Sequence, residues 1–393
     1  GTAADQQTKI TRMQQYLHWK HNRIGIAVSS DGAWHKRSLG KGTYNSNTGH
    51  NFAVGGLSKK ILSTVVYSKM CRACSTAAKL GLLEPPPHRC SKNFDENKSS
   101  KSMEGEAAVQ HCINIGTQPT GAYVYTLVTD DDSTVRANTK HSYKAIAERD
   151  YPGYRRKADT DWPFYMDNSK NPPKQVFLLD KGFLPLYCPP VEEWLSDIGH
   201  RVKCIGGLAF EHVAKSKKAF EAGTHLSKGE CLKMKKYASY FLKTPENQAL
   251  PFDEFCRKAP CMYLHHFDDH SCCSDRWCKV LQSRRQDDPI PLPLNYMKRF
   301  RCKKKHSILF KKMQAGMANY LTVDALKQVY HSFSTQKNES LNKKVTVVAP
   351  KDKFYGFTRT LQDRVHWVVV EDSIGYYKGL QRVYQQLGVP FDA

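Results

Sequence analysis

The sequence predicts an α/β fold whose sheet is interrupted by a mainly helical insertion. Three β-rich runs between residues 23 and 67 are followed by a helix at 103–115 and a strand at 122–129. From residue 210 to residue 330 the apolar spacing is mostly helical, and a further strand and helix follow near the carboxyl end. This order of elements indicates a mixed five-stranded sheet with flanking helices.

The strands are defined by runs rich in Val, Ile, Tyr and Thr. The first spans residues 23–30 (Arg-Ile-Gly-Ile-Ala-Val-Ser-Ser) and ends at Asp31-Gly32, a dipeptide typical of turns. Residues 52–57 and 62–67 extend it to a three-strand meander. Residues 122–129 (Ala-Tyr-Val-Tyr-Thr-Leu-Val-Thr) form the clearest strand, which runs directly into an acidic triplet.

Two polar stretches separate these elements. Residues 84–102, rich in Pro, Lys, Asn and Ser, predict a loop, and residues 151–175 predict a second, inserted loop. Near the carboxyl end, residues 366–370 predict a strand, and residues 376–387 predict a helix closed by a following glycine.

The same order divides the chain into three segments. We expect residues 1–205 to form the first part of the core, with a loop insertion at 151–175. Residues 206–325 are expected to form a helical, zinc-containing insertion, and residues 326–393 the final part of the core.

The charge of the chain points to a polyanionic partner. The 393 residues carry a formal net charge of +23, with basic clusters at 298–312 and 215–218. Basic side chains gain affinity for nucleic acid by releasing condensed counterions from its phosphates. A solvated basic surface would give the same pattern. No apolar run approaches the ~20 residues of a membrane helix, so we expect no membrane partner.

Three acidic residues stand at positions that suit a metal-dependent nuclease. Asp31 and Asp130 each follow an apolar run, and Glu339 lies in a polar, helix-compatible segment. Two Mg²⁺ ions held roughly 3.5–4 Å apart by carboxylates can activate an oxygen nucleophile and stabilise a leaving oxygen. Two acids at strand ends and a distant Glu on a helix are what an RNase H-like core needs for this purpose. Taken singly, the three read as a turn, a helix N-cap and a solvated helix residue.

Several short motifs occur in a fixed order along nearly the whole chain. They are Ser30 to Arg37 (Ser-Asp-Gly-Ala-Trp-His-Lys-Arg), Ser68 to Cys74, His88-Arg89-Cys90, Asp130 to Ser133, Asp197 to Arg201, Trp277-Cys278 and Asn338 to Asn342. With these motifs the chain resembles the catalytic domain of Mutator-like transposases, eukaryotic cut-and-paste enzymes of the DDE type.

The resemblance implies a set of site residues and partners. Asp31, Asp130 and Glu339 would be the catalytic triad and would bind Mg²⁺ or Mn²⁺, with Asp132 as the alternative second acid. Double-stranded DNA would be the substrate, at transposon ends and at the target. The resemblance also implies a homodimer or higher assembly and a location in the nucleus.

The family also carries a Cys-or-Asp, two residues, His motif between the second and third acids, and Asp197 and His200 fit it. His200 could orient the scissile phosphate or protonate a leaving oxygen, because its ordinary pKa is near neutrality. Cys204 and His212 are competing candidates at a wider spacing. Alternatively, His200 caps or braces a helix.

The thirteen cysteines favour metal ligation over a disulfide framework, since their number is odd and no secretory signal is present. Two groups have ligand spacing for a structural, four-coordinate Zn²⁺ ion. Unliganded thiols are the alternative for both. The first group is His266, His270, Cys273 and Cys278, and the second is Cys71, Cys74, His88 and Cys90. In the first group the neighbours His265 and Cys272 leave the choice of ligands open by one residue.

These observations together predict a DNA transposase. The expected chemistry is metal-dependent hydrolysis at transposon ends followed by strand transfer into target DNA. A domesticated, catalytically silent DNA-binding protein and a ribonuclease with the same core are the alternatives.

Overall fold

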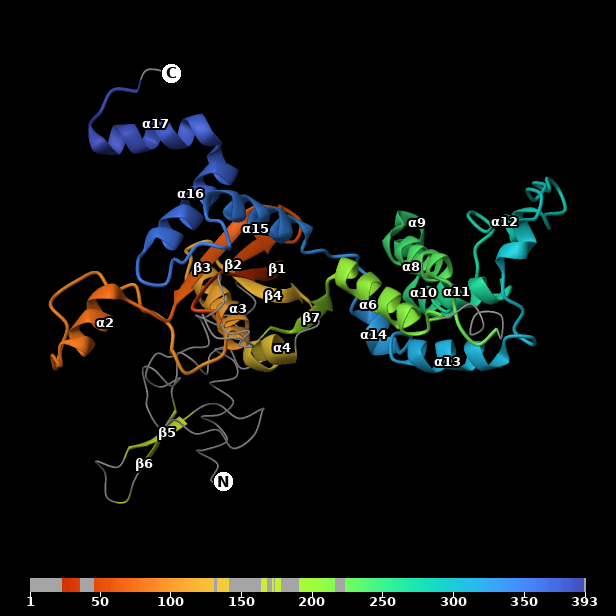
Figure 1. Ribbon diagram of the computed structural model, residues 1–393, viewed down its shortest axis with the longest axis horizontal. Coiled ribbons are helices and arrows are strands. Elements are labelled where there is room, and N and C mark those ends of the chain that lie inside the picture. Colours follow the sequence, from red (N-terminus) through yellow and green to blue (C-terminus); the bar gives the residue numbers. More distant parts are fainter. Residues whose placement is uncertain are drawn as a thin grey trace. The chain divides into compact units, whose positions relative to one another are not determined.

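The computed structural model describes residues 23–35, 46–130, 133–140, 164–167, 172, 174–177, 191–215 and 223–391 (Figure 1). The chain divides into two compact units. The first comprises Gly1–Trp194 and Thr335–Ala393, and the second comprises Leu195–Ser334. These divisions lie at 194/195 and 334/335, whereas the sequence led us to expect them at 205/206 and 325/326.

A five-stranded mixed sheet forms the centre of the first unit. Its strand order is β3-β2-β1-β4-β7. The antiparallel pairs β1–β2 and β2–β3 form the expected meander, and β4 pairs with β1 in parallel. The predicted α/β class and mixed five-stranded sheet are therefore confirmed. The strands are β1 (Ile24–Trp34), β2 (Thr48–Gly55), β3 (Ile61–Ser68), β4 (Ala122–Thr129) and β7 (Glu193–Ser196).

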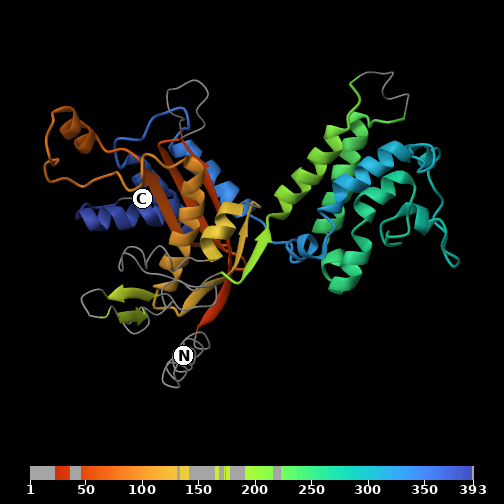
Figure 2. The same cartoon turned by 90° about the horizontal axis from the view of Figure 1, so that it is seen from below.

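Helices cover both faces of this sheet (Figure 2). Successive side chains of a strand point to opposite faces, so each strand contributes side chains to the packing on both. On one face, Val28 and Ala53 pack against α3 (Ser100–Gly116). On the other face, Phe52 and Val54 pack against α15 (Gln336–Val348) and α16 (Thr360–Ile374). Every residue of β2 is buried, as expected for a strand covered on both sides.

Two sequence predictions in this unit are wrong. Residues 366–370 are not a strand but part of α16, where Leu361, Val365 and Val368 are buried at helical spacing against the sheet. The predicted loop at 151–175 contains β5 (Phe164–Asp167), which pairs antiparallel with β6 (Lys174–Phe177).

The other helices in the described part of this unit are α2 (Arg72–Lys79), α4 (Ser133–Lys140) and α17 (Tyr376–Leu387). The prediction for α17 is confirmed at both ends. Its C-cap is Gly388, whose φ of 67° lies in the left-handed region that favours glycine.

The second unit is built from short helices around its own apolar core, as the helical spacing between residues 210 and 330 predicted. Phe241, Phe255, Phe267 and Met313 lie at the centre of this core, each almost fully buried. Among the described helices of the chain we find no candidate for a membrane-spanning segment. The helices among the described residues of this unit are α6 (Ile198–Glu211), α8 (Lys228–Lys243), α9 (Pro245–Gln248), α10 (Phe252–Lys258), α11 (Cys261–Leu264), η2 (His265–Phe267), α12 (Lys279–Gln282), η3 (Tyr296–Arg299), α13 (Ser307–Ala318) and α14 (Val323–Lys327).

A buried asparagine fixes α15 on the sheet. The Nδ2 group of Asn338 donates to the carbonyl oxygens of Ser29 (3.2 Å) and Phe52 (2.7 Å). Its Oδ1 accepts from the hydroxyl of Ser29 at 2.7 Å. The side chain is fully buried, so these bonds replace water completely. One residue of α15 is therefore tied to both β1 and β2.

We predict that Asn338→Ala lowers the free energy of unfolding by about 1–3 kcal/mol, because it leaves buried polar groups of Ser29 and Phe52 without partners. Denaturant titration measures the change. Ser340→Ala, at an exposed position of the same helix, should stay within about 0.5 kcal/mol of the parent. Equal effects of the two variants would contradict a role for Asn338 in anchoring α15.

Candidate functional site

A cavity of about 810 Å³ lies beside the face of the sheet that α15 covers. Asp31 of β1 and Glu339 of α15 both line it, although they are far apart in the sequence. Asn342, Lys343 and Lys351 also contribute to its wall. Asp130 is not one of the described residues that line this cavity, and Asp132 lies outside the described residues.

The position of Asp31 differs from the predicted one. We expected it at the end of the first strand, but β1 continues to Trp34. Asp31-Gly32 does not turn because both residues pair with β2, opposite Phe52 and Asn51. The pairing of β1 with β4 ends before Asp31, and the last pair of this ladder is Ser29 and Val128.

Asp130 is the first residue after β4. Ser29 of β1 and Val128 of β4 form the last pair of this parallel ladder, so Asp31 and Asp130 each stand two residues beyond it. Asp130 therefore leaves the sheet beside the strand that carries Asp31, and its place in the catalytic triad stays a prediction.

Glu339 follows the buried Asn338 on α15, as the predicted helix requires. Four residues after Asn338, Asn342 returns to the same helix face and reaches the sheet. Its Nδ2 group donates to Oδ2 of Asp31 at 3.0 Å. Asn338 and Asn342 thus fix the helix from which Glu339 projects, and Asn342 also orients the carboxylate of Asp31.

Two buried histidines extend this series of hydrogen bonds beyond Asn342. His50 Nε2 lies 3.1 Å from Asn342 Oδ1, and His50 Nδ1 lies 3.2 Å from His35 Nε2. Because an amide oxygen only accepts, His50 must donate through Nε2 and accept at Nδ1 from His35. Sequence reasoning missed this chain. The only signal was the alternation along β2, which places His50 on the same face as Phe52.

Burial holds both imidazoles neutral. Desolvation lowers the pKa of His50 to about 3, and the neighbouring His35 and the charge of Lys351 act in the same direction. Desolvation and Lys351 lower the pKa of His35 to about 4. At neutral pH both rings are therefore uncharged hydrogen-bonding groups and not imidazolium ions.

Asp197 and His200 belong to the second unit. The carboxylate of Asp197 is buried, caps α6 and accepts a hydrogen bond from the backbone N–H of His200 at 2.5 Å. The capping alternative is thus realised by Asp197. Of the two competing candidates, Cys204 lies within α6 and His212 at its C-cap. A catalytic role for Asp197 or His200 stays a prediction.

The first Cys/His cluster consists of His265, His270, Cys273 and Cys278, whose ligand atoms all lie within 4.8 Å of one another. All four are buried. His265 Nδ1 is 3.4 Å from Cys273 Sγ, and His270 Nδ1 is 3.4 Å from Cys278 Sγ. Two nitrogens and two sulfurs in this arrangement could bind a structural Zn²⁺ ion. Asp268 Oδ1, 3.1 Å from His270 Nε2, would orient that ring.

His266, which we predicted as a ligand, is not part of this cluster. Four-residue spacing would align it with His270 only if the helix continued between them. Instead the chain passes through η2 and then Asp268, which has a left-handed φ of 58°. His266 consequently faces Glu230, with 3.6 Å between Nε2 and Oε1, and the neighbouring His265 takes the ligand position.

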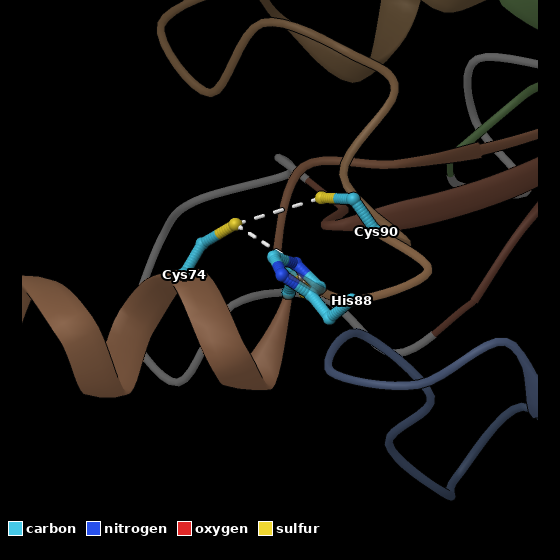
Figure 3. A group of neighbouring side chains, drawn as sticks. Cys74, His88 and Cys90 are labelled. Atoms are coloured by element: carbon cyan, nitrogen blue, oxygen red, sulfur yellow. Dashed lines mark hydrogen bonds between the residues drawn. The ribbon is translucent and has the colours of Figure 1, made fainter. Parts of the chain in front are cut away.

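The second cluster, Cys71, Cys74, His88 and Cys90, agrees with the prediction in all four residues. His88 Nε2 lies 3.3 Å from Cys71 Sγ and 3.4 Å from Cys74 Sγ, and the sulfurs of Cys74 and Cys90 are 3.5 Å apart (Figure 3). Cys71 is the N-cap residue of α2, and Cys74 lies in the first turn of this helix.

The local structure suits thiolate ligands. Burial would raise the pKa of Cys71, but the N–H groups of Cys74 and Ser91 lower it to about 5. His88 Nδ1 lies 2.8 Å from the carbonyl oxygen of Pro86, which leaves Nε2 directed at the sulfurs. Three sulfurs and one nitrogen could bind Zn²⁺. Only Cys71 of the four is buried, in contrast to the first cluster.

Comparison with known proteins gives one match. The family model described as Mutator-like transposase matches residues 2–153, which confirms the family resemblance over this part of the chain. The matched segment contains Asp31, Asp130 and the second Cys/His cluster, and ends before Glu339. No curated protein and no solved structure matches the chain.

We predict that His35 and His50 do not titrate near neutral pH. Both folded pKa values lie below the ordinary 6.5, so below pH 6.5 the unfolded chain binds protons that the folded chain excludes. Acidification from pH 6.5 towards pH 4 should therefore reduce the free energy of unfolding. Nitrogen-15 NMR of the imidazoles provides the direct check, and a midpoint above pH 6 for either ring would refute the prediction.

We predict that His265→Ala lowers the zinc content by one ion per chain, whereas His266→Ala leaves it unchanged. The reason is that, of these two histidines, only His265 directs a ring nitrogen at Cys273 and Cys278. Mass spectrometric metal analysis after dialysis measures the content, and circular dichroism checks that each variant is folded. The opposite pattern, with zinc lost only from His266→Ala, would restore the ligand set first expected from the sequence.

Proposed function

We propose that this chain, whose residues 2–153 match the Mutator-like transposase family, is a DDE-type DNA transposase. Its reaction would be hydrolysis of phosphodiester bonds at transposon ends, followed by attack of a 3′-hydroxyl on target DNA. The observation that carries the proposal is the shared cavity of Asp31 and Glu339, two acids from distant parts of the sequence.

The architecture of the first unit supports an RNase H-like core. An antiparallel three-strand meander precedes a strand that pairs in parallel with β1, and helices cover both faces. The helix α15, which carries Glu339, belongs to the first unit but follows the second unit in the sequence, as expected for a core interrupted by an insertion.

The donor groups fit Mg²⁺ or Mn²⁺. Asp31, Asp130 and Glu339 would hold the ions through carboxylate oxygens, the ligands that hard divalent cations prefer. Bound metal supplies activation of an oxygen nucleophile and stabilisation of the leaving oxygen. Asn342 holds Asp31 in one orientation through its 3.0 Å hydrogen bond, a constraint typical of metal-ligand carboxylates.

The charge around the acids fits a phosphodiester substrate. Lys343 and Lys351, both exposed, share the cavity with Asp31 and Glu339. Their ammonium groups would attract the DNA backbone to a site whose acids alone would repel it. The net charge of +23 acts in the same direction over the whole chain. A nuclear location follows from DNA as the substrate.

We assign structural Zn²⁺ to both Cys/His clusters. Each cluster offers four protein ligands with no open position for a substrate. The metal would supply folding energy to the segments that carry its ligands.

The alternative is a silent DNA-binding protein derived from a transposase. The net charge and the cavity lysines fit this alternative as well as they fit the transposase. Only the behaviour of the acids therefore distinguishes the two functions. Binding of Mn²⁺ gives a simple readout, because a ligand that binds only the folded state raises the melting temperature.

We predict that Asp31→Asn, Asp130→Asn and Glu339→Gln each abolish metal-dependent cleavage of plasmid DNA carrying the transposon ends, because an amide is a weaker metal ligand than a carboxylate. DNA binding should persist. Each variant should also lose the rise in melting temperature that Mn²⁺ gives the parent. Gel electrophoresis and thermal denaturation measure the two effects.

The matched control is Asp352→Asn, an exposed acid of the first unit, which should cleave like the parent. Cleavage by any of the three variants removes that residue from the triad. A parent protein that binds DNA, cuts nothing and gains no thermal stability from Mn²⁺ would favour the silent alternative. Cleavage of duplex RNA in preference to DNA would indicate a ribonuclease.

A further inference from the structure

A second cavity, of about 460 Å³, adjoins the Cys71–Cys74–His88–Cys90 cluster. Three segments of the first unit form its wall: α2, the loop at 86–91 and the loop that leads into α16. The third segment is tied to the others by its backbone. The N–H of Arg72 donates to Phe357 O at 3.2 Å, and the hydroxyl of Ser68 donates to Gly356 O at 3.1 Å.

Each wall segment contributes one arginine: Arg72, Arg89 and Arg359. None of them has an ion-pair partner among the described residues, and no carboxylate is among the described residues that line the cavity. The buried Nε of Arg359 has no hydrogen-bond partner in the described part of the chain. A buried N–H without an acceptor is costly, so the protein itself satisfies this guanidinium only incompletely.

The chemistry of the wall suits a phosphate group. A guanidinium presents paired N–H donors in a planar fork that matches phosphate oxygens. The hydroxyl of Thr76 adds a neutral hydrogen-bonding group to the wall, whereas the hydroxyls of Ser91 and Thr358 already donate to Met70 O and to the Thr360 hydroxyl. Of the acids near the wall in sequence, Glu96 pairs with Lys92 and Glu106 with Lys98, whereas Glu84 is exposed and does not line the cavity.

The Cys/His cluster controls the position of two of these arginines. Arg72 follows Cys71 directly, and Arg89 stands between His88 and Cys90. Cys71 and His88 line the cavity and also belong to the cluster. The loop has little apolar anchoring of its own, since Leu82 and Leu83 are exposed, and Figure 3 shows His88 and Cys90 reaching the sulfur of Cys74 from this loop.

We propose that this cavity binds a phosphate of the DNA backbone and that Zn²⁺ at the Cys71–Cys74–His88–Cys90 cluster holds its arginines in place. The identity of the polyanion as DNA rests on the proposed function. The site would grip DNA by its backbone and carry no information about base sequence.

Salt-dependent binding to a fluorescent DNA duplex tests the cavity. The logarithm of the binding constant falls with the logarithm of salt concentration by ~0.9 for each phosphate contact. In a Glu339→Gln background, which prevents cleavage, Arg72→Gln and Arg359→Gln should each weaken binding and reduce this slope by about 1.

Arg382→Gln is the matched control, because it removes the same charge from an exposed position of α17 away from the cavity wall. It should leave the slope close to the parental value. Slopes unchanged in the Arg72 and Arg359 variants, or an equal reduction in Arg382→Gln, would overturn the proposal. Inorganic phosphate and a mononucleotide are the free-anion probes. If either binds as tightly as the duplex and with the same arginine dependence, the assignment to DNA backbone is overturned.

Zinc removal tests the second half of the proposal. Cys74→Ser and Cys90→Ser should each lose one zinc ion and show the same reduced slope as the arginine variants, with an unchanged far-ultraviolet dichroism spectrum. Cys302→Ser, at an exposed cysteine outside both clusters, should retain both properties. A zinc-depleted variant with a parental slope would overturn the role of the metal.

The outcome is separable from that of the proposed function. If the parent cleaves DNA with Mg²⁺ and the arginine variants keep the parental salt slope, only this inference is overturned. Arginine-dependent DNA binding in a protein that never cleaves overturns the transposase and leaves the phosphate site standing.

Discussion

The anchoring of α15 by Asn338 is the interaction on which the candidate site depends. Leu341 and Val345 give the helix its apolar contact with the sheet, but such contact is non-directional and tolerates small rotations. The three hydrogen bonds of Asn338 are directional and remove that freedom. Successive helical residues are rotated by about 100°, so a slip of one position would turn Glu339 away from the cavity and separate Asn342 from Asp31.

The polar groups on the two faces of β1 show how the sheet combines rigidity with chemistry. Ser29 and Asp31 point to α15, whereas Ser30 points to α3 and donates to Asn51, which also lies 2.9 Å from His111. Burial lowers the pKa of His111 to about 3, so this second network is also neutral at physiological pH. A strand that carries a charged acid is thus held on both faces by uncharged hydrogen-bonded groups, which fixes its position without introducing competing charges.

Much of the fold was predictable because local patterns and tertiary structure agree. The strand at 122–129 and the helix at 376–387 have the predicted bounds, since apolar runs and a terminal glycine are local signals. The prediction failed where long-range pairing decided the conformation. Asp31-Gly32 is extended because β2 pairs with it, and 366–370 is helical because Val365 and Val368 pack together on the sheet. Of the site, most cluster ligands were predictable from residue type and spacing, whereas the three acids were chosen through the family resemblance and their catalytic role stays a prediction. The Asn342–His50–His35 chain was not, because it joins residues that only the folded sheet brings together.

The first unit is discontinuous in sequence, since Leu195–Ser334 separates its strands from α15 and α16. On a ribosome that adds ~5–20 residues per second, roughly ten to thirty seconds pass between synthesis of the last strand and of the helix bearing Glu339. During this interval Phe52 and Val54 on one face of the meander have no covering helix, and the nascent chain depends on chaperones or on neighbouring segments to shield them. The same delay has a second consequence, because a nascent or truncated chain that ends before α15 lacks the wall that Glu339 and Asn342 give to the 810 Å³ cavity.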